Sequence, residues 1–300
     1  HAAEQHAEPA VRLLQIRRAD LHGHAARDLA HRRQQRQAAG VLPLASDGAR
    51  KLIAAALAIG NEPWQLAVLF ETVALGEGGK AFYRKAFLEQ DSATLTGPDM
   101  VRVLTRFQQL RAYVPEKYAG LKWHQATNLL ESGGAAMQIM GDWVKGELSA
   151  GNYRPGEDID CLPSPGSQGL FSYNLDSIAM FKQRDPAQLQ AQGELARLLM
   201  TPRFQEEFNR VKGSIPALTQ PDMSKFDRCA IRSYQDFLHA EQQDNLLPSM
   251  AEGMAVPTNM RQGIMDVLSS FFNDSRANPE QTAQQLERAM RSTRSGAEQK

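Results

Sequence analysis

The sequence predicts a helix-rich α/β protein, on three observations. From Pro63 onward, apolar residues recur at helical spacing in a series of segments, several of which begin at proline, a residue tolerated in the first turn of a helix. Short apolar runs that suit buried strands lie between these segments. No fixed-period repeat or low-complexity linker divides the region. Helices that alternate with short strands are typical of an α/β architecture.

The predicted elements follow one another closely. Helices are predicted at 64–75, where Gly76, Gly78 and Gly79 are expected to end the helix, and at 81–89, 98–114, 123–131, 186–200, 202–211, 226–241, 258–273 and 279–291. Strands are predicted at 135–140, 159–163, 170–173 and 177–181. At about 150 residues per domain, a chain of 300 residues suggests two domains.

Composition excludes several classes of protein. The 34 Lys and Arg residues balance 34 Asp and Glu residues, which argues against a broad electrostatic grip on nucleic acid. The longest strongly apolar run, 52–59, is far shorter than the roughly 20 residues that span a bilayer. Two cysteines exclude a zinc ribbon but allow one disulfide. No charged-then-apolar leader opens the sequence, so the sequence itself predicts no export signal.

The first 63 residues differ in composition from the rest of the chain. They contain no Phe, Tyr or Trp, and the first lysine is Lys51. Five of the seven histidines lie there: His1, His6, His22, His24 and His31. A metal-binding or basic arm is one interpretation. These histidines have no repeated spacing, so we favour a poorly packed, partly helical segment and expect no metal site.

Motifs for catalysis or nucleotide binding are absent from the sequence. It has no phosphate-binding glycine loop, no dinucleotide fingerprint, no Gly-x-Ser-x-Gly and no His-Glu-x-x-His, and no cofactor is expected. His124 and His239 are predicted on solvated helix faces. Asp142 and Glu147 could act as acid and base in glycoside cleavage, although no spacing rule supports that pair.

Aromatic and charged residues in turn-rich settings are the remaining site candidates. Trp143 follows Gly-Asp directly after the apolar run 135–140. Asp176 lies inside an otherwise apolar segment, Lys212 begins a Gly turn, and Glu252 interrupts a methionine-rich run. Proteins bind sugars by stacking them on aromatic rings while charged groups hydrogen-bond the hydroxyls. These residues would fit that chemistry in one cleft, but a tryptophan such as Trp143 is more often a core or capping aromatic, and the alternative for Asp176 is that it only braces a turn.

Several strings carry a specific resemblance. They are GNEPWQLAVLFETVALGEGGKAFYRKAF, AAMQIMGDWVKGEL, CLPSPGSQGLFSYNLDSIAMF, NRVKGSIPA and LLPSMAEGMA. In order, and over 60–291, they resemble the periplasmic glucose/mannose-binding proteins of bacterial ABC transporters, a family of extracellular solute-binding proteins. The resemblance implies two α/β lobes that close about a hinge on a monosaccharide such as glucose or mannose. It also implies a periplasmic monomer without catalysis, which delivers sugar to membrane permease subunits.

The resemblance also assigns residues. Trp143 matches the stacking tryptophan of the Gly-Asp-Trp motif, Asp176 the hydroxyl-binding carboxylate of Tyr-Asn-x-Asp-Ser, and Lys212 the lysine of Lys-Gly-Ser-Ile-Pro. Trp64, in the first string, is added as a sugar-binding candidate. Glu252 stands where the family often has histidine, which replaces a neutral donor with an anionic acceptor and puts the sugar preference in doubt.

The amino-terminal part departs from the family. Residues 1–58 do not resemble the first lobe, 41–45 resemble the strand that leads into 60–64, and 46–57 look like extra material. We therefore expect a periplasmic-binding-protein-like fold with an incomplete first lobe, as an incorrect start or a shifted reading frame would produce. Within 59–300, segments 59–158 and 219–300 are assigned mainly to the carboxyl-terminal lobe. Segment 159–218 is assigned to the hinge crossing and the remnant of the first lobe.

The resulting hypothesis is a sugar-binding component of an ABC importer, with two alternatives left open. One is a carbohydrate-acting hydrolase that uses paired carboxylates, and the other is a non-functional fragment. Because the resemblance implies an exported protein, Cys161 and Cys229 are expected to form a disulfide. Two buried free thiols are the alternative.

Overall fold

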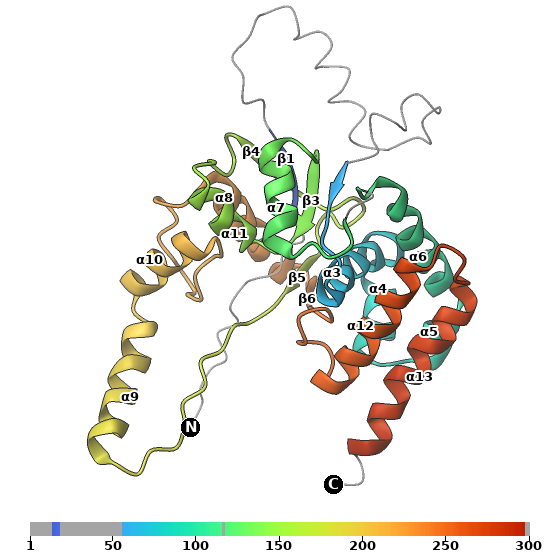
Figure 1. The fold of residues 1–300 in the computed structure, drawn as a ribbon. Coiled ribbons are helices and arrows are strands. Elements are labelled where there is room, and N and C mark those ends of the chain that lie inside the picture. Colours follow the sequence, from blue (N-terminus) through green and yellow to red (C-terminus); the bar gives the residue numbers. More distant parts are fainter. Residues whose placement is uncertain (1–13, 19–55, 116–117, 298–300) are drawn as a thin grey trace, which may run out of the picture.

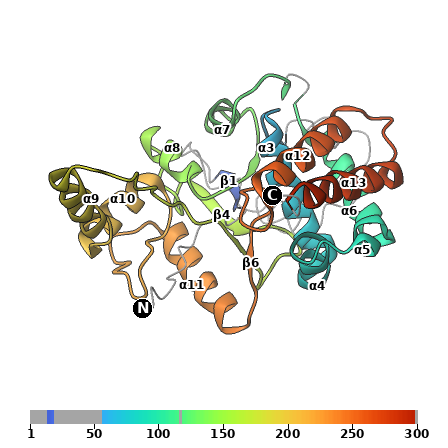
Figure 2. The ribbon, with the colours of Figure 1, turned by 90° about the horizontal axis from the view of Figure 1, so that it is seen from below.

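The computed structural model describes residues 14–18, 56–115 and 118–297. In this part of the chain, short strands lie between two groups of helices (Figures 1 and 2). One group contains α3 to α6 together with α12 and α13, and the other contains α8 to α11. The amino-terminal and carboxyl-terminal helices of the described sequence therefore contribute to the same helical group.

The first helical group is assembled around the largest hydrophobic core. Its helices are α3 (Pro63–Val73), α4 (Gly79–Tyr83), α5 (Ser92–Thr96), α6 (Pro98–Gln109), α12 (Thr258–Asn273) and α13 (Pro279–Ala297). Residues 65–73 of α3 are buried on every side, as expected for a helix that lies inside a core. Phe107 of α6 meets Phe70 of α3 and Phe272 of α12 with ring centroids 5.5 and 4.8 Å apart. These aromatic contacts fix the three helices together.

The glycines after α3 do not end the helix as the sequence predicted. The chain continues through a π-helical turn, Ala74–Gly78, directly into α4, and a second π turn, Arg84–Leu88, follows. The physical reason lies in a close approach: a Cβ on Gly76 would lie 2.3 Å from the carbonyl oxygen of Pro165. Gly76 therefore lets the turn after β4 pack on this helix rather than terminating it.

Two small sheets connect the helical groups. The first has the strand order β2-β3-β1-β4, with β2 (Leu57–Ala58), β3 (Met137–Met140), β1 (Leu14–Arg18) and β4 (Ile159–Pro163). β2 is parallel to β3, whereas β1 is antiparallel to both β3 and β4. The second sheet pairs β5 (Phe171–Tyr173) with β6 (Leu246–Pro248) in parallel. Parallel pairing places the carboxyl ends of β5 and β6 at one edge.

β1 corrects part of the prediction for the amino-terminal segment. Residues Leu14–Arg18 were expected in a poorly packed, partly helical stretch, but they form a strand between β3 and β4. In the register, Leu14 lies opposite Met140 and Pro163. The alternation of Leu-Gln-Ile fits a strand, although a run this short gives a weak periodic signal. Residues 1–13 and 19–55, with the five amino-terminal histidines, lie outside the described residues.

The second helical group contains α8 (Val144–Ala150), α9 (Pro186–Leu199), α10 (Pro202–Lys212) and α11 (Arg228–Gln242), with α7 (Trp123–Ser132) beside the first sheet. The Cys161–Cys229 disulfide joins β4 to α11 with Cα atoms 5.5 Å apart, which confirms the expected bridge. Both cysteines belong to a small core with Met140 and Ile159. This core binds the first sheet to α8 and α11.

The predicted strand 177–181 is wrong, because this segment forms no regular secondary structure. Its apolar side chains are exposed, including Ile178 at 62% and Phe181 at 79%. Exposed apolar residues continue along α9 and α10, which project away from the body in Figure 1.

None of the described helices is long and apolar enough to cross a membrane. The lobe boundaries at 158 and 218 stay a prediction.

Candidate functional site

The loop after β3 places Trp143 at the junction of two cores. The Trp143 ring folds back over Gly141, where any Cβ would overlap the ring at 2.1 Å, so only glycine fits there. Trp143 meets Trp64 with ring centroids 6.3 Å apart and an interplanar angle of 49°. Both tryptophans are partly buried and pack against the two hydrophobic cores on either side. The structure thus brings two of the predicted aromatic residues together.

Asp142 lies beside Trp143 and is a buried carboxylate that the sequence pointed to only as half of an acid–base pair. Its side chain is 1% exposed, and Oδ1 accepts a long hydrogen bond of 3.4 Å from Ser214 Oγ. Its Oδ2 has no hydrogen-bond partner among the described residues. Burial raises the pKa of Asp142 to about 7, and the positive charges of Lys145 and Lys212 oppose that rise. Asp142 therefore changes its protonation state near neutral pH.

The turn after α10 brings Lys212 and Ser214 to the same place. Gly213 ends α10 with φ of 90°, a left-handed conformation that favours glycine. A Cβ on Gly213 would lie 2.8 Å from the carbonyl oxygen of Asp142. The two segments consequently touch backbone to backbone, which explains why a Lys-Gly-Ser sequence suits this position.

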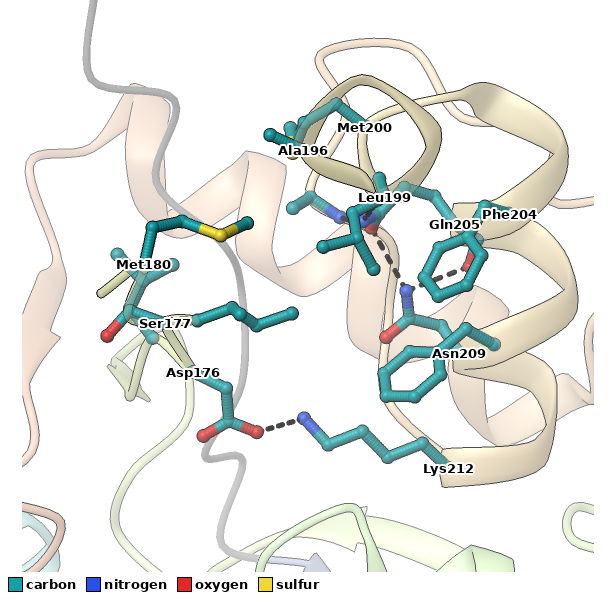
Figure 3. Close-up of a pocket in the computed structure, with 14 residues that line it drawn as sticks. Asp176, Ser177, Met180, Ala196, Leu199, Met200, Phe204, Gln205, Asn209 and Lys212 are labelled. Carbon is teal, nitrogen blue, oxygen red and sulfur yellow. Dashed lines mark hydrogen bonds and ion pairs between the residues drawn. The ribbon is translucent and has the colours of Figure 1, made fainter. Parts of the chain in front are cut away.

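Asp176 and Lys212 form an ion pair, as Figure 3 shows. The pair lies at the edge of a cavity of about 400 Å³ lined mainly by apolar residues of 175–180, α9 and α10. The side chain of Asp176 is 59% exposed and that of Lys212 is 26% exposed. An exposed pair of this kind contributes little to stability. The charges are therefore available to polar groups of a ligand.

Glu252 occupies the loop between β6 and α12. Its side chain is 15% exposed and lies 3.8 Å from the Arg261 guanidinium, while Oε1 finds no hydrogen-bond partner in the part of the chain that the structure describes. Burial raises the pKa of Glu252 to about 7; Arg261 lowers it, and the negative charges of Glu71 and Asp176 raise it further. Through this coupling Glu252 belongs to the same electrostatic group as Asp176.

The predicted residues thus form two contacting pairs and one coupled residue. Trp64 contacts Trp143, Asp176 pairs with Lys212, and Asp142 connects the pairs because it precedes Trp143 and senses the charges of Lys212 and Asp176. Trp143 does not line the cavity beside Asp176. Sequence analysis missed Ser214 and Glu71, although Ser214 stood inside the recognised Lys-Gly-Ser string.

The alternative catalytic groups have different surroundings. Glu147 is exposed on α8, whereas Asp142 is buried, so the two carboxylates do not share one environment. His124 and His239 are exposed on α7 and α11, which confirms their predicted placement on solvated helix faces. Among the described residues, no three His, Cys, Asp or Glu side chains are arranged to hold a metal ion.

The fold is shared with a class of solved structures, the two-lobe solute-binding proteins. A solved structure of this class is the bacterial solute receptor AcbH, whose description records an exclusive preference for β-D-galactopyranose. The two structures align with a TM-score of 0.68 and 15% sequence identity. The alignment covers 95% of this chain and 71% of the AcbH chain. The likeness shows the fold, while no protein-family model matches the chain.

Within that class, the chain is a relative of curated proteins named "Probable sugar-binding periplasmic protein". The protein of Brucella suis is 40% identical over 220 residues, which are 72% of this chain and 51% of that protein. The protein of Mesorhizobium japonicum is 34% identical over 254 residues, 85% of this chain and 58% of that protein. The chain therefore spans about half the length of the curated relatives that it matches.

Proposed function

We propose that this protein binds a monosaccharide and serves as the periplasmic sugar-binding component of an ABC importer, without catalysis. The observation that carries the proposal is the identity of 34–40% with sugar-binding periplasmic proteins over at least 220 residues. The ligand would be glucose or mannose, and the membrane partner would be the permease of the importer. In this proposal the protein acts as a monomer and has no nucleic-acid partner.

The proposal uses three kinds of group to bind the sugar. Trp143 offers a partly exposed ring held in place by Trp64. Asp176 and Lys212 together offer an acceptor and a donor for hydroxyls, and Glu252 offers a mostly buried carboxylate, whose Oε1 no described residue binds. A sugar face stacked on the ring, with its hydroxyls bonded to these charges, is the chemistry that recognises a monosaccharide.

Ligand binding would act on the equilibrium between open and closed arrangements of the two lobes. A sugar that contacts both walls of a cleft binds the closed state more tightly and shifts the population toward it. The permease would then recognise the closed form.

The direct test is isothermal titration of the purified protein with glucose, mannose and xylose. Heat of binding to glucose or mannose, without turnover of the sugar, supports the proposal. Release of product from an oligosaccharide would instead favour a hydrolase. Absence of binding to all three sugars in a protein with a cooperative melt would refute binding of this class by the chain, and a non-cooperative melt would indicate a fragment that does not fold.

Trp143→Ala tests the stacking residue. We expect it to weaken sugar binding by about 1 to 3 kcal/mol, since a large aromatic surface is lost. Trp123→Ala is the matched control, because Trp123 is also partly buried against the smaller core but meets His124 rather than Trp64. Equal loss of affinity in both variants, or unchanged affinity in Trp143→Ala, contradicts the assignment.

A further inference from the structure

Glu71 is a buried carboxylate on α3 that the proposed sugar contacts do not use. Its side chain is fully buried, and its oxygens bind the loop between β6 and α12. Ser249 Oγ donates to Glu71 Oε2 at 2.7 Å, and the Met250 amide donates to Oε1 at 2.5 Å. The Tyr83 hydroxyl and, at 3.4 Å, the Ala251 amide also donate to Oε1.

Four donors therefore converge on one carboxylate that can only accept when ionised. Burial raises the pKa of Glu71, whereas the hydrogen bonds from Tyr83, Ser249, Met250 and Ala251 lower it. Every donor comes from outside α3, and three of them come from the same loop. The ionised form accepts from all four donors at once; a protonated Oε1 keeps the Tyr83 contact only if the Tyr83 hydroxyl donates to the Pro248 carbonyl, 2.9 Å away, instead.

The network extends from Glu71 to Glu252. Ser249 Oγ, while it donates to Glu71, accepts the Glu252 amide at 3.0 Å. Arg261 Nε of α12 donates to the Ala251 carbonyl of the same loop at 2.6 Å. The backbone that carries Glu252 is thus held between a buried anion on α3 and a cation on α12.

We propose that Glu71 is a positioning residue: it holds loop 249–252 in the conformation that presents Glu252 to the sugar. This inference rests on the proposed function, since it gives that site a residue that acts through Glu252 without touching ligand. Glu71 does so in two ways, through the hydrogen bonds to Ser249 and Met250 and through its negative charge.

The negative charge of Glu71 distinguishes the proposed positioning role from a purely structural one, because it changes the pKa of Glu252. The charged groups that act on Glu252 are Arg261 from α12, which lies 3.8 Å away, Glu71 from α3 and Asp176 from the segment after β5. The negative charge of Glu71 favours the protonated form of Glu252. Removal of that charge should therefore lower the pH at which Glu252 ionises, and the pH profile of any binding that uses Glu252 should move to lower pH.

The experiment compares wild type, Glu71→Gln, Glu252→Gln and the double variant. Glu71→Gln keeps the shape of the side chain while it removes the charge and converts one oxygen into a donor. Glucose affinity is titrated between about pH 5 and pH 9, a range that covers the ionisation of a buried carboxyl. Glu77→Gln is the control, since Glu77 pairs with Arg106 at the surface close to the same helix.

We expect Glu71→Gln to weaken glucose binding about tenfold, as the loss of a charge-assisted hydrogen bond does, and to move the midpoint of the pH profile downward. The shift should vanish when Glu252 is already glutamine. Unchanged affinity and midpoint in a Glu71→Gln protein with a wild-type melt would overturn the inference, as would a shift that persists in the double variant.

A second measurement applies to the ligand-free protein. Carboxyl-carbon NMR of Glu252 gives its titration midpoint directly, and amide exchange of Met250 and Ala251 reports the order of the loop. Glu71→Gln should lower the midpoint and speed exchange at both amides. If no sugar binds but these changes occur, the proposed function fails while the positioning role stands; if neither changes, the positioning role fails.

Discussion

Asp142→Asn isolates the effect of one buried carboxyl on stability. In the folded protein the pKa of Asp142 is about 7, well above the ordinary aspartate value of 3.8, because the side chain is buried. The folded state therefore keeps a proton on Asp142 that the unfolded chain releases as the pH rises from about 4 to about 7. The contribution of Asp142 to the free energy of unfolding is therefore fully present below about pH 4, near its pKa in the unfolded chain. It is lost as the pH rises to about 7, its pKa in the folded protein.

The magnitude follows from the difference between the two pKa values. About three pH units at about 1.4 kcal/mol each gives a loss of about 4 kcal/mol for wild type across the whole range. Between pH 5 and pH 8 the loss is about 3 kcal/mol. Asparagine carries no proton to lose, so the free energy of unfolding of Asp142→Asn should rise relative to wild type by that amount between these two pH values.

Urea denaturation of both proteins at pH 5 and pH 8 measures the effect. The comparison between pH values cancels any constant cost of the substitution, such as a poorer bond to Ser214. Asp99→Asn serves as the control because Asp99 is exposed on α6 and paired with Arg102. A stability difference between Asp142→Asn and wild type that stays the same at both pH values would refute the reasoning.

Two further substitutions test the scaffold around the site. Joint replacement of Cys161 and Cys229 by alanine should lower the free energy of unfolding by about 4 kcal/mol, because the bridge closes a loop with a sequence separation of 68. Urea denaturation without reductant measures this, and a wild-type midpoint that reductant does not move would contradict it. Gly213→Ala should lower stability by about 2 kcal/mol, because its φ is 90° and its Cβ would meet the Asp142 carbonyl. Thermal melts should show no such loss for the control Gly193→Ala, where a Cβ would meet only the Arg197 side chain at 3.8 Å.

Amphipathic helices could be predicted because their signal is local. The helix at 258–273 was predicted with the boundaries that the structure has, since its apolar residues recur at helical spacing. β2 and β6, of two and three residues, were not predicted, because such short runs have no measurable period. The segment 177–181 has the composition of a strand but was predicted wrongly, since strand formation depends on a pairing partner that composition does not reveal.

In the candidate site too, residues in local strings could be predicted, whereas contacts between distant segments could not. Trp143, Asp176 and Lys212 stand in recognisable strings, so a resemblance could name them as candidates before any coordinates. The link between Glu71 and Ser249 joins residues 178 positions apart, and no local pattern predicts such a contact. Burial of Asp142 likewise depends on the Lys-Gly-Ser turn, which approaches from 71 residues away along the chain.

The disulfide also has a topological consequence. The loop that it closes contains Asp176, Lys212, α9 and α10, together with the exposed extended segment that carries Lys182 and Arg184. Exposed segments without regular structure are preferred sites of proteolytic nicking. A single tryptic cut at Lys182 or Arg184 would leave both pieces covalently joined through the bridge, so the nicked protein would run as one chain on a denaturing gel until a reductant separated the fragments.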